Sequence, residues 1–203
     1  PSRVPTRKEL AVLRGLADSM SLTAAVHDKR MHRKLAPAAG PARNVFEAIE
    51  RCRIESIGAN RMPGMAMNLA AKMEDHYGHG RYDEILDRAD APLEDAVALI
   101  LRERLTGQAP PPGAQKIVDL WRPFVEEKGE TTLKKLENAN FSQSQFAKIA
   151  RDLLKDLELT ETSAEGQPDD GDDKEQDQAE GGDAEAQEQQ EGSEAQEDAS
   201  DDE

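Results

Sequence analysis

The feature that most constrains the fold of this chain is the sharp change in composition near residue 161. Residues 161–203 contain 19 acidic residues and one basic residue, and their only apolar side chains are six alanines. Such a segment cannot bury enough apolar surface to offset the backbone entropy lost on folding, about 1–2 kcal/mol per residue. Residues 161–203 are therefore predicted to be a disordered acidic linker, and a hydrophobic core has to come from residues 1–160.

Residues 1–160 have the composition of an ordinary globular domain. They contain 25 basic and 23 acidic residues, so the formal net charge of −16 belongs to the acidic linker. Their longest apolar run, residues 96–101, is far shorter than the roughly 20 residues of a membrane span, so no membrane association is predicted. The single cysteine, Cys52, excludes an internal disulfide and favours a reducing compartment, so we expect a cytoplasmic protein.

Apolar residues recur at helical spacing through most of residues 1–160, which predicts an all-α body of about six to eight helices. Capping boxes at Thr6–Glu9 and Ser142–Gln145 predict two helix starts. Gly58 and Gly107 predict helix ends, and Pro123 predicts a kink or a restart. The predicted helices cover about residues 7–19, 22–35, 41–58, 64–77 and 93–106, a segment around Pro123, and 142–157, with Asp90 as a cap before the fifth.

The proline-rich stretch at residues 108–113 predicts a stiff connector between two helical subdomains. We expect an N-terminal subdomain at residues 1–107 and a C-terminal subdomain at residues 114–160, followed by the acidic linker at 161–203.

The four histidines are the first candidates for chemistry, and they form two pairs. His27 and His32 are five residues apart, so they cannot bind one metal from a single straight helical face. His76 and His79, beside Glu74 and Asp75, have a chelating spacing, but Gly78 interrupts the helix between them. A helix end that favours a protonated imidazole is the simpler interpretation, so no bound metal is expected. Glu74, Asp75, His76 and His79 stay as metal candidates.

Basic residues are densest at Lys29, Arg30, Arg33 and Lys34. No aromatic residue that could stack on bases lies beside them, so nucleic-acid binding is not predicted. These four residues and Arg61 are instead candidates for binding a partner subunit or the acidic linker.

Other motifs of chemistry are missing from the sequence. No phosphate-binding loop of the Gly-x-x-x-x-Gly-Lys-Ser/Thr type occurs, so ATP binding in that manner is excluded. Glu47, Arg51 and Glu55, at steps of four, are predicted to form a solvent-facing ladder of charges on one helix. No catalytic residue is assigned, and Cys52 is predicted to be a small buried residue.

Several long strings resemble the T subunit (CobT) family of aerobic, ATP-dependent cobaltochelatases. The resemblance extends over about residues 6–160. The matching strings are residues 27–37, 53–58, 60–62, 68–70, 87–99, 102–107 and 118–123.

The resemblance implies a subunit of a complex that inserts Co²⁺ into the corrin ring of hydrogenobyrinic acid a,c-diamide in cobalamin biosynthesis. It implies two partners: an AAA+ ATPase ring that uses ATP and Mg²⁺, and a large subunit that binds the tetrapyrrole. It also implies that an acidic linker like residues 161–203 leads to a von Willebrand A domain. This chain is then expected to bind no cofactor itself and to supply contacts rather than chemistry in a ring assembly.

Two alternatives stay open. In one, His76, His79, Glu74 and Asp75 deliver the metal. In the other, the acidic segment is a tether or a regulator that folds onto residues 29–34.

Overall fold

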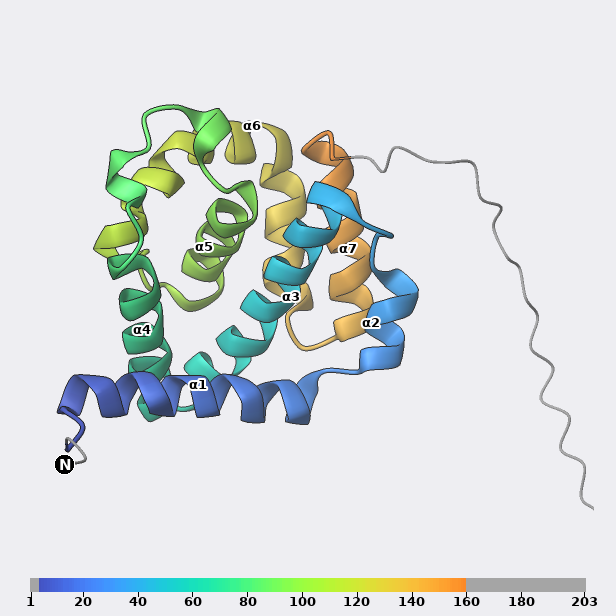
Figure 1. Ribbon diagram of the computed structural model, residues 1–203. Helices are drawn as coiled ribbons and strands as arrows, with labels where there is room; N and C mark the ends of the chain where they lie inside the picture. Colours follow the sequence, from blue (N-terminus) through green and yellow to red (C-terminus); the bar gives the residue numbers. More distant parts are fainter. Residues whose placement is uncertain (1–3, 160–203) are drawn as a thin grey trace, which may run out of the picture. The chain divides into compact units, whose positions relative to one another are not determined.

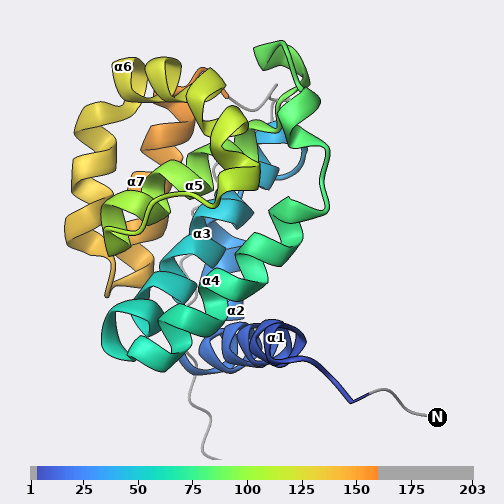
Figure 2. The same ribbon diagram turned by 90° about the vertical axis from the view of Figure 1, so that its left-hand side faces the viewer.

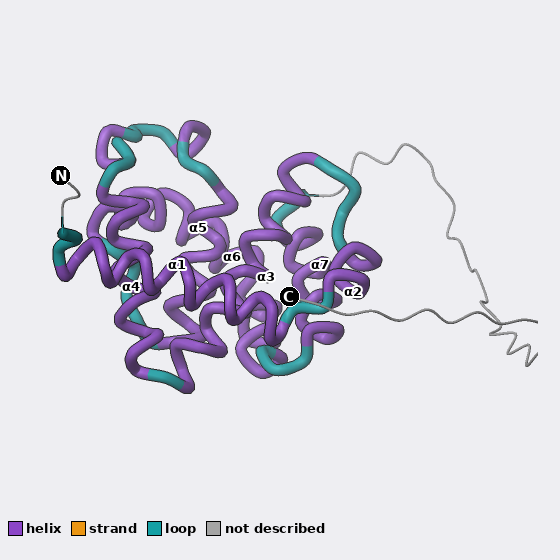
Figure 3. Tube along the Cα trace, turned by 60° about the horizontal axis from the view of Figure 1, so that its bottom comes forward, coloured by secondary structure: helices purple, strands orange, loops and turns teal. Residues whose placement is uncertain are grey.

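A computed structural model describes residues 4–159, and these residues belong to one compact unit. Within them lie seven α-helices and no strand (Figure 3). This confirms the all-α prediction, whereas the predicted disorder of residues 161–203 concerns a segment outside the described residues. The helices are α1 (Arg7–Val26), α2 (Lys29–Leu35), α3 (Gly40–Arg61), α4 (Pro63–Gly78), α5 (Leu93–Thr106), α6 (Gln115–Ala139) and α7 (Gln143–Asp156), with short 3₁₀ helices η1 (Tyr82–Glu84), η2 (Arg88–Asp90) and η3 (Pro112–Ala114).

Local capping chemistry explains several helix ends. The Thr6 backbone N–H donates to Glu9 Oε2 at 2.7 Å, and the Glu9 N–H donates to Thr6 Oγ1 at 3.2 Å, which confirms the capping box. The Ser142 hydroxyl accepts from the Gln145 N–H and caps α7. Gly107 ends α5 with a left-handed backbone, φ 71°, a conformation that costs glycine little.

Four boundaries differ from the prediction. Helix α1 continues past Ser19 to Val26, so it includes the first residues of the helix predicted at 22–35. The rest of that predicted helix begins only at Lys29, as α2, because Asp28 caps it there. Helix α3 continues past Gly58 to Arg61, because Gly58 serves packing instead: a Cβ there would lie 2.4 Å from Cδ1 of Leu22 on α1. Asp90 lies in η2 and does not cap α5, which begins directly after Pro92.

Helix α6 runs through Pro123 as one helix of 25 residues. Its ribbon changes direction between its first and second halves (Figures 1 and 2). Proline removes one backbone hydrogen bond and displaces the preceding turn, which bends a helix. Of the two predicted outcomes, the structure therefore shows the kink and not the restart.

The main core is built from α3, α5, α6 and α7. Among its buried side chains are Phe46, Ile100, Leu133 and Phe146, so it combines residues from before and after the connector at 108–113. The division at that connector into two subdomains stays a prediction. A smaller cluster of Leu22, Ile54 and Leu69 lies under α1. Figures 1 and 2 show α1 lying along one side of this helical body.

Close approach of α1 to α4 yields a stability prediction at Gly15. A Cβ at Gly15 would lie 2.2 Å from the Asn68 carbonyl oxygen, so the two backbones have to separate to accept any side chain. Gly15→Ala is therefore expected to destabilise the protein by about 1–3 kcal/mol, although alanine favours helices. The free energy of unfolding in urea measures the effect.

Gly64→Ala on α4 is the matched control. Nothing lies within 4 Å of a Cβ built at Gly64, so the same substitution should leave stability unchanged or raise it by up to about 1 kcal/mol. Equal unfolding free energies for the two variants would contradict the close α1–α4 contact.

Candidate functional site

Helix α1 carries an exposed apolar row of Leu13, Leu16 and Met20, which we call the α1 stripe. These side chains are 56%, 48% and 75% exposed, and their spacing of three and four places them on one helix face. The opposite face, with Gly15 and Leu22, packs on α4 and α3. The spacing of these residues is visible in the sequence, and the structure turns them to solvent. Grouped exposed apolar side chains are typical of protein-binding surfaces.

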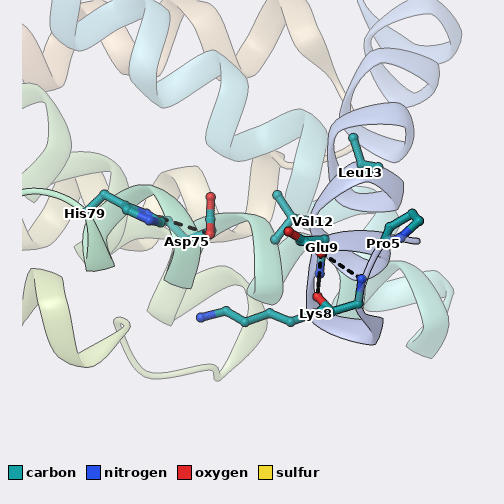
Figure 4. A pocket seen from close by; sticks show the side chains of 8 residues that line it. Pro5, Lys8, Glu9, Val12, Leu13, Asp75 and His79 are labelled. Atoms are coloured by element: carbon teal, nitrogen blue, oxygen red, sulfur yellow. Dashed lines mark hydrogen bonds and ion pairs between the residues drawn. The ribbon is translucent and has the colours of Figure 1, made fainter. Parts of the chain in front are cut away.

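One end of α1 and the end of α4 form a shallow pocket (Figure 4). Val12 and Leu13 supply apolar surface, and Asp75 and His79 face it from α4. Nδ1 of His79 lies 2.6 Å from the Asp75 carbonyl oxygen and 3.7 Å from its carboxylate oxygen Oδ1. His79 therefore binds back to its own helix end, as expected of an imidazole near a helix C-terminus.

The remaining metal candidates lie apart from that contact. Glu74 and His76 are exposed on α4, and His76 also lines a separate cavity, where its ring lies 4.8 Å from that of Tyr77. Within residues 4–159, the three-residue grouping with metal-ligand spacing is His27, His32 and Glu50. The assignment of a metal to Glu74, Asp75, His76 and His79 stays a prediction.

The five basic interface candidates are all exposed. Helix α2 directs His32 inward and leaves Lys29, Arg30, Arg33 and Lys34 in solvent. The guanidinium of Arg61 lies 5.3 Å from the centre of the exposed Phe141 ring, a cation–π distance.

Phe141 lies two residues before Gln143, whose side chain accepts from the backbone N–H of Asp28 at 2.7 Å, where α2 begins. Residues 141–143 therefore contact both Arg61 and Asp28, the residue that caps α2.

A cavity of about 440 Å³, lined by both charged and apolar side chains, lies between α1, α3, α4 and α5. Glu55 is buried there and pairs with Lys72 and with the Ser19 hydroxyl at 2.7 Å. Burial lowers the pKa of Arg102, which donates to Gln108 at 2.6 Å. Burial also raises the pKa of Asp95, which lines the cavity, so the cavity presents one ion pair and one perturbed carboxyl.

Cys52 lines the same cavity and is buried, at 7% exposure. Burial raises the pKa of the Cys52 thiol to about 12, so the reactive thiolate is scarce at neutral pH. Its placement confirms the prediction of a small buried residue on the face of α3 that also carries Ile49.

Two interpretations of charged residues on α3 and its neighbours are corrected. Glu55 does not face solvent as part of a ladder with Glu47 and Arg51; it is buried, and Lys72 of α4 pairs with its carboxylate. His27 and His32 do not share one straight helix, because α1 ends at Val26 and Asp28 caps α2. The turn brings their rings to 4.8 Å.

Sequence reasoning also missed the buried ion pair of Glu50 and Arg53. Arg53 Nε and Nη2 donate to Glu50 Oε2 and Oε1 at 2.8 and 2.7 Å. The available signal was their i, i+3 spacing on an otherwise apolar helix face. The Arg53 Nη2 group also donates to the Val26 carbonyl at 3.0 Å, so this pair ties α1 to α3.

These features define an all-α protein whose exposed surface includes an apolar stripe and a basic helix. Within residues 4–159, no helix is both long and apolar enough to cross a membrane. The family model described as "Cobalamin biosynthesis protein CobT" matches residues 1–203, so the chain belongs to the CobT family, which implies a role in cobalamin biosynthesis. No solved structure matches the chain.

Proposed function

We propose that this chain is a docking and coupling region of a cobaltochelatase complex, and that it contributes protein contacts rather than chemistry. In this proposal the complex inserts Co²⁺, its substrate, into hydrogenobyrinic acid a,c-diamide. An AAA+ ATPase subunit hydrolyses ATP with Mg²⁺, and a large subunit holds the tetrapyrrole. Membership of the CobT family supports the pathway, and the matching strings in residues 6–160 support the division of work among subunits.

The observation that carries the docking role is the α1 stripe. Large apolar residues in a helical body are normally buried, yet Leu13 and Met20 lie on the outer face of a helix whose inner face is already packed. Leu16, between them, is 48% exposed, although it also lines the cavity between α1, α3, α4 and α5. Covering this face with a partner would remove about 25 cal/mol of unfavourable hydration free energy for each Å² of apolar surface buried.

The basic helix α2 follows α1 directly, and its four exposed cations suit an acidic surface on the same partner. Charges at the rim of an interface mainly raise the association rate and select the partner. We assign both surfaces to the AAA+ subunit, which places this chain against a ring assembly. The single buried, unpaired cysteine supports a cytoplasmic location for that assembly.

Co-elution with the AAA+ subunit tests the proposal. The 203-residue chain is mixed with the purified ATPase with and without ATP, and the mixture is separated by size. We expect a shared peak in at least one nucleotide state. Separate elution in both states, while the intact T subunit co-elutes with the same ATPase, would refute the docking role of this region.

A further inference from the structure

Three side chains from separate elements meet at the turn between α1 and α2. His27 ends α1, His32 belongs to α2, and Glu50 belongs to α3; each offers a donor atom, and these atoms lie within 4.8 Å of one another. Nδ1 of His27 lies 2.8 Å from Oε1 of Glu50. All three side chains are largely buried, at 12% exposure or less. Two imidazoles and one carboxylate form a common ligand set for transition metals.

His32 provides an independent observation that points to a ligand. Its side chain is 8% exposed, and its Nδ1 has no hydrogen-bond partner. Its Nε2 lies 2.9 Å from Oε2 of Glu47, an ion-pair contact. Burying a polar atom without a partner costs about 1–3 kcal/mol, so the unpartnered Nδ1 requires an explanation. A bound cation would satisfy it.

Neighbouring residues hold these three side chains in place, as the outer coordination shell of a metal site does. Arg53 holds both oxygens of Glu50, and the carbonyls of Val26 and Asn140 accept from Arg53 at 3.0 and 3.4 Å. Such contacts orient a ligand carboxylate. Glu47 is 40% exposed, and it supplies a further oxygen beside His32 on the side that solvent reaches.

We propose that His27, His32 and Glu50 bind one late first-row divalent cation, such as Zn²⁺ or Co²⁺. Tetrahedral ligand bonds of about 2.0–2.2 Å place donor atoms about 3.3–3.6 Å apart, so the three donor atoms, which lie within 4.8 Å of one another, shift by up to about 1 Å on binding. Imidazole nitrogens disfavour Mg²⁺ and Ca²⁺, which prefer oxygen ligands. Because Arg43 and Arg53 already pair with the two nearby carboxylates, the affinity is weaker than that of a thiolate site.

The site lies beneath the surface and joins three helices, so its role is structural and separate from the proposed docking. A cation here fastens the α1–α2 turn, and with it the end of α1, to α3. It lies on residues other than the Glu74, Asp75, His76 and His79 group that the sequence singled out.

Titration of the metal-free 203-residue chain with Co²⁺ tests this site. We expect one equivalent to bind, with visible ligand-field absorption that Zn²⁺ abolishes by competition. His32→Phe removes both ring nitrogens but keeps a ring against Phe46, and His27→Asn keeps an amide near Glu50. Each should weaken Co²⁺ binding more than about 100-fold, since even outer-shell changes cost about 10–100-fold. Circular dichroism shows whether each variant folds.

A double variant, His76→Ala with His79→Ala, is the matched control and should bind Co²⁺ like the parent chain. The proposal is overturned if the parent chain binds no Co²⁺, or if a folded His27→Asn or His32→Phe variant binds it unchanged. It is also overturned if the absorption disappears in the His76/His79 variant. None of these results depends on the ATPase partner, so they leave the docking proposal to its own test.

Discussion

Replacing Arg53 with methionine is expected to lower the free energy of unfolding by about 3–5 kcal/mol, because the Glu50 carboxylate is left buried without its cation. Arg53 is only 1% exposed and ranks among the largest fully buried side chains of the described residues. Its loss also leaves the Val26 carbonyl without this donor and so loosens the end of α1. Urea unfolding followed by circular dichroism measures the effect.

Glu50→Leu combined with Arg53→Met is the control for this prediction. Replacing both partners of a buried ion pair by apolar residues is often neutral or stabilising, so the double variant should recover much of the lost stability. Arg51→Met, at an exposed position two residues away, should change stability by less than about 0.5 kcal/mol. Similar unfolding free energies for Arg53→Met and Arg51→Met would contradict the buried pair.

Replacing Leu13 and Met20 together with serine is expected to weaken association with the AAA+ subunit by about 30-fold or more. One hot-spot side chain at the centre of an interface is worth about 2 kcal/mol, which is about 30-fold in affinity. Both side chains are exposed in the unbound chain, so its fold and stability should change little. The dissociation constant from a binding titration against the purified ATPase measures the loss.

Leu86→Ser is the matched control for the stripe. Leu86 is 79% exposed between η1 and η2, outside α1 and α2, so its loss should leave the affinity unchanged. Equal weakening by Leu86→Ser and by the double substitution would show that the α1 stripe has no special part in the interface.

Local rules read from the sequence accounted for much of the fold. The caps at Thr6 and Ser142 and the left-handed glycine at Gly107 depend on residues within a few positions, so they were predictable. Gly58 was misread because its role depends on Leu22, a residue from another helix. The sequence likewise shows the spacing of the residues in the α1 stripe, but it does not show which face of α1 packs on its neighbours. The exposure of the stripe was therefore not predictable.

The polar sites were less accessible to sequence reasoning. His27 and His32 were judged on one continuous helix, whereas a two-residue break places their rings together. Glu55 and Glu50 lie on the same helix as exposed charged residues, and only tertiary partners, Lys72 and His27, distinguish them. The basic side chains of α2 were predictable as exposed because no apolar residue competes for that face.

Hydrogen–deuterium exchange in the complex tests the central claim most directly. Amide exchange is compared for the 203-residue chain alone and bound to the AAA+ subunit. The docking proposal predicts slower exchange on binding in α1 and α2, with α6 unchanged. Protection confined to other helices, with α1 and α2 exchanging as in the free chain, would contradict it.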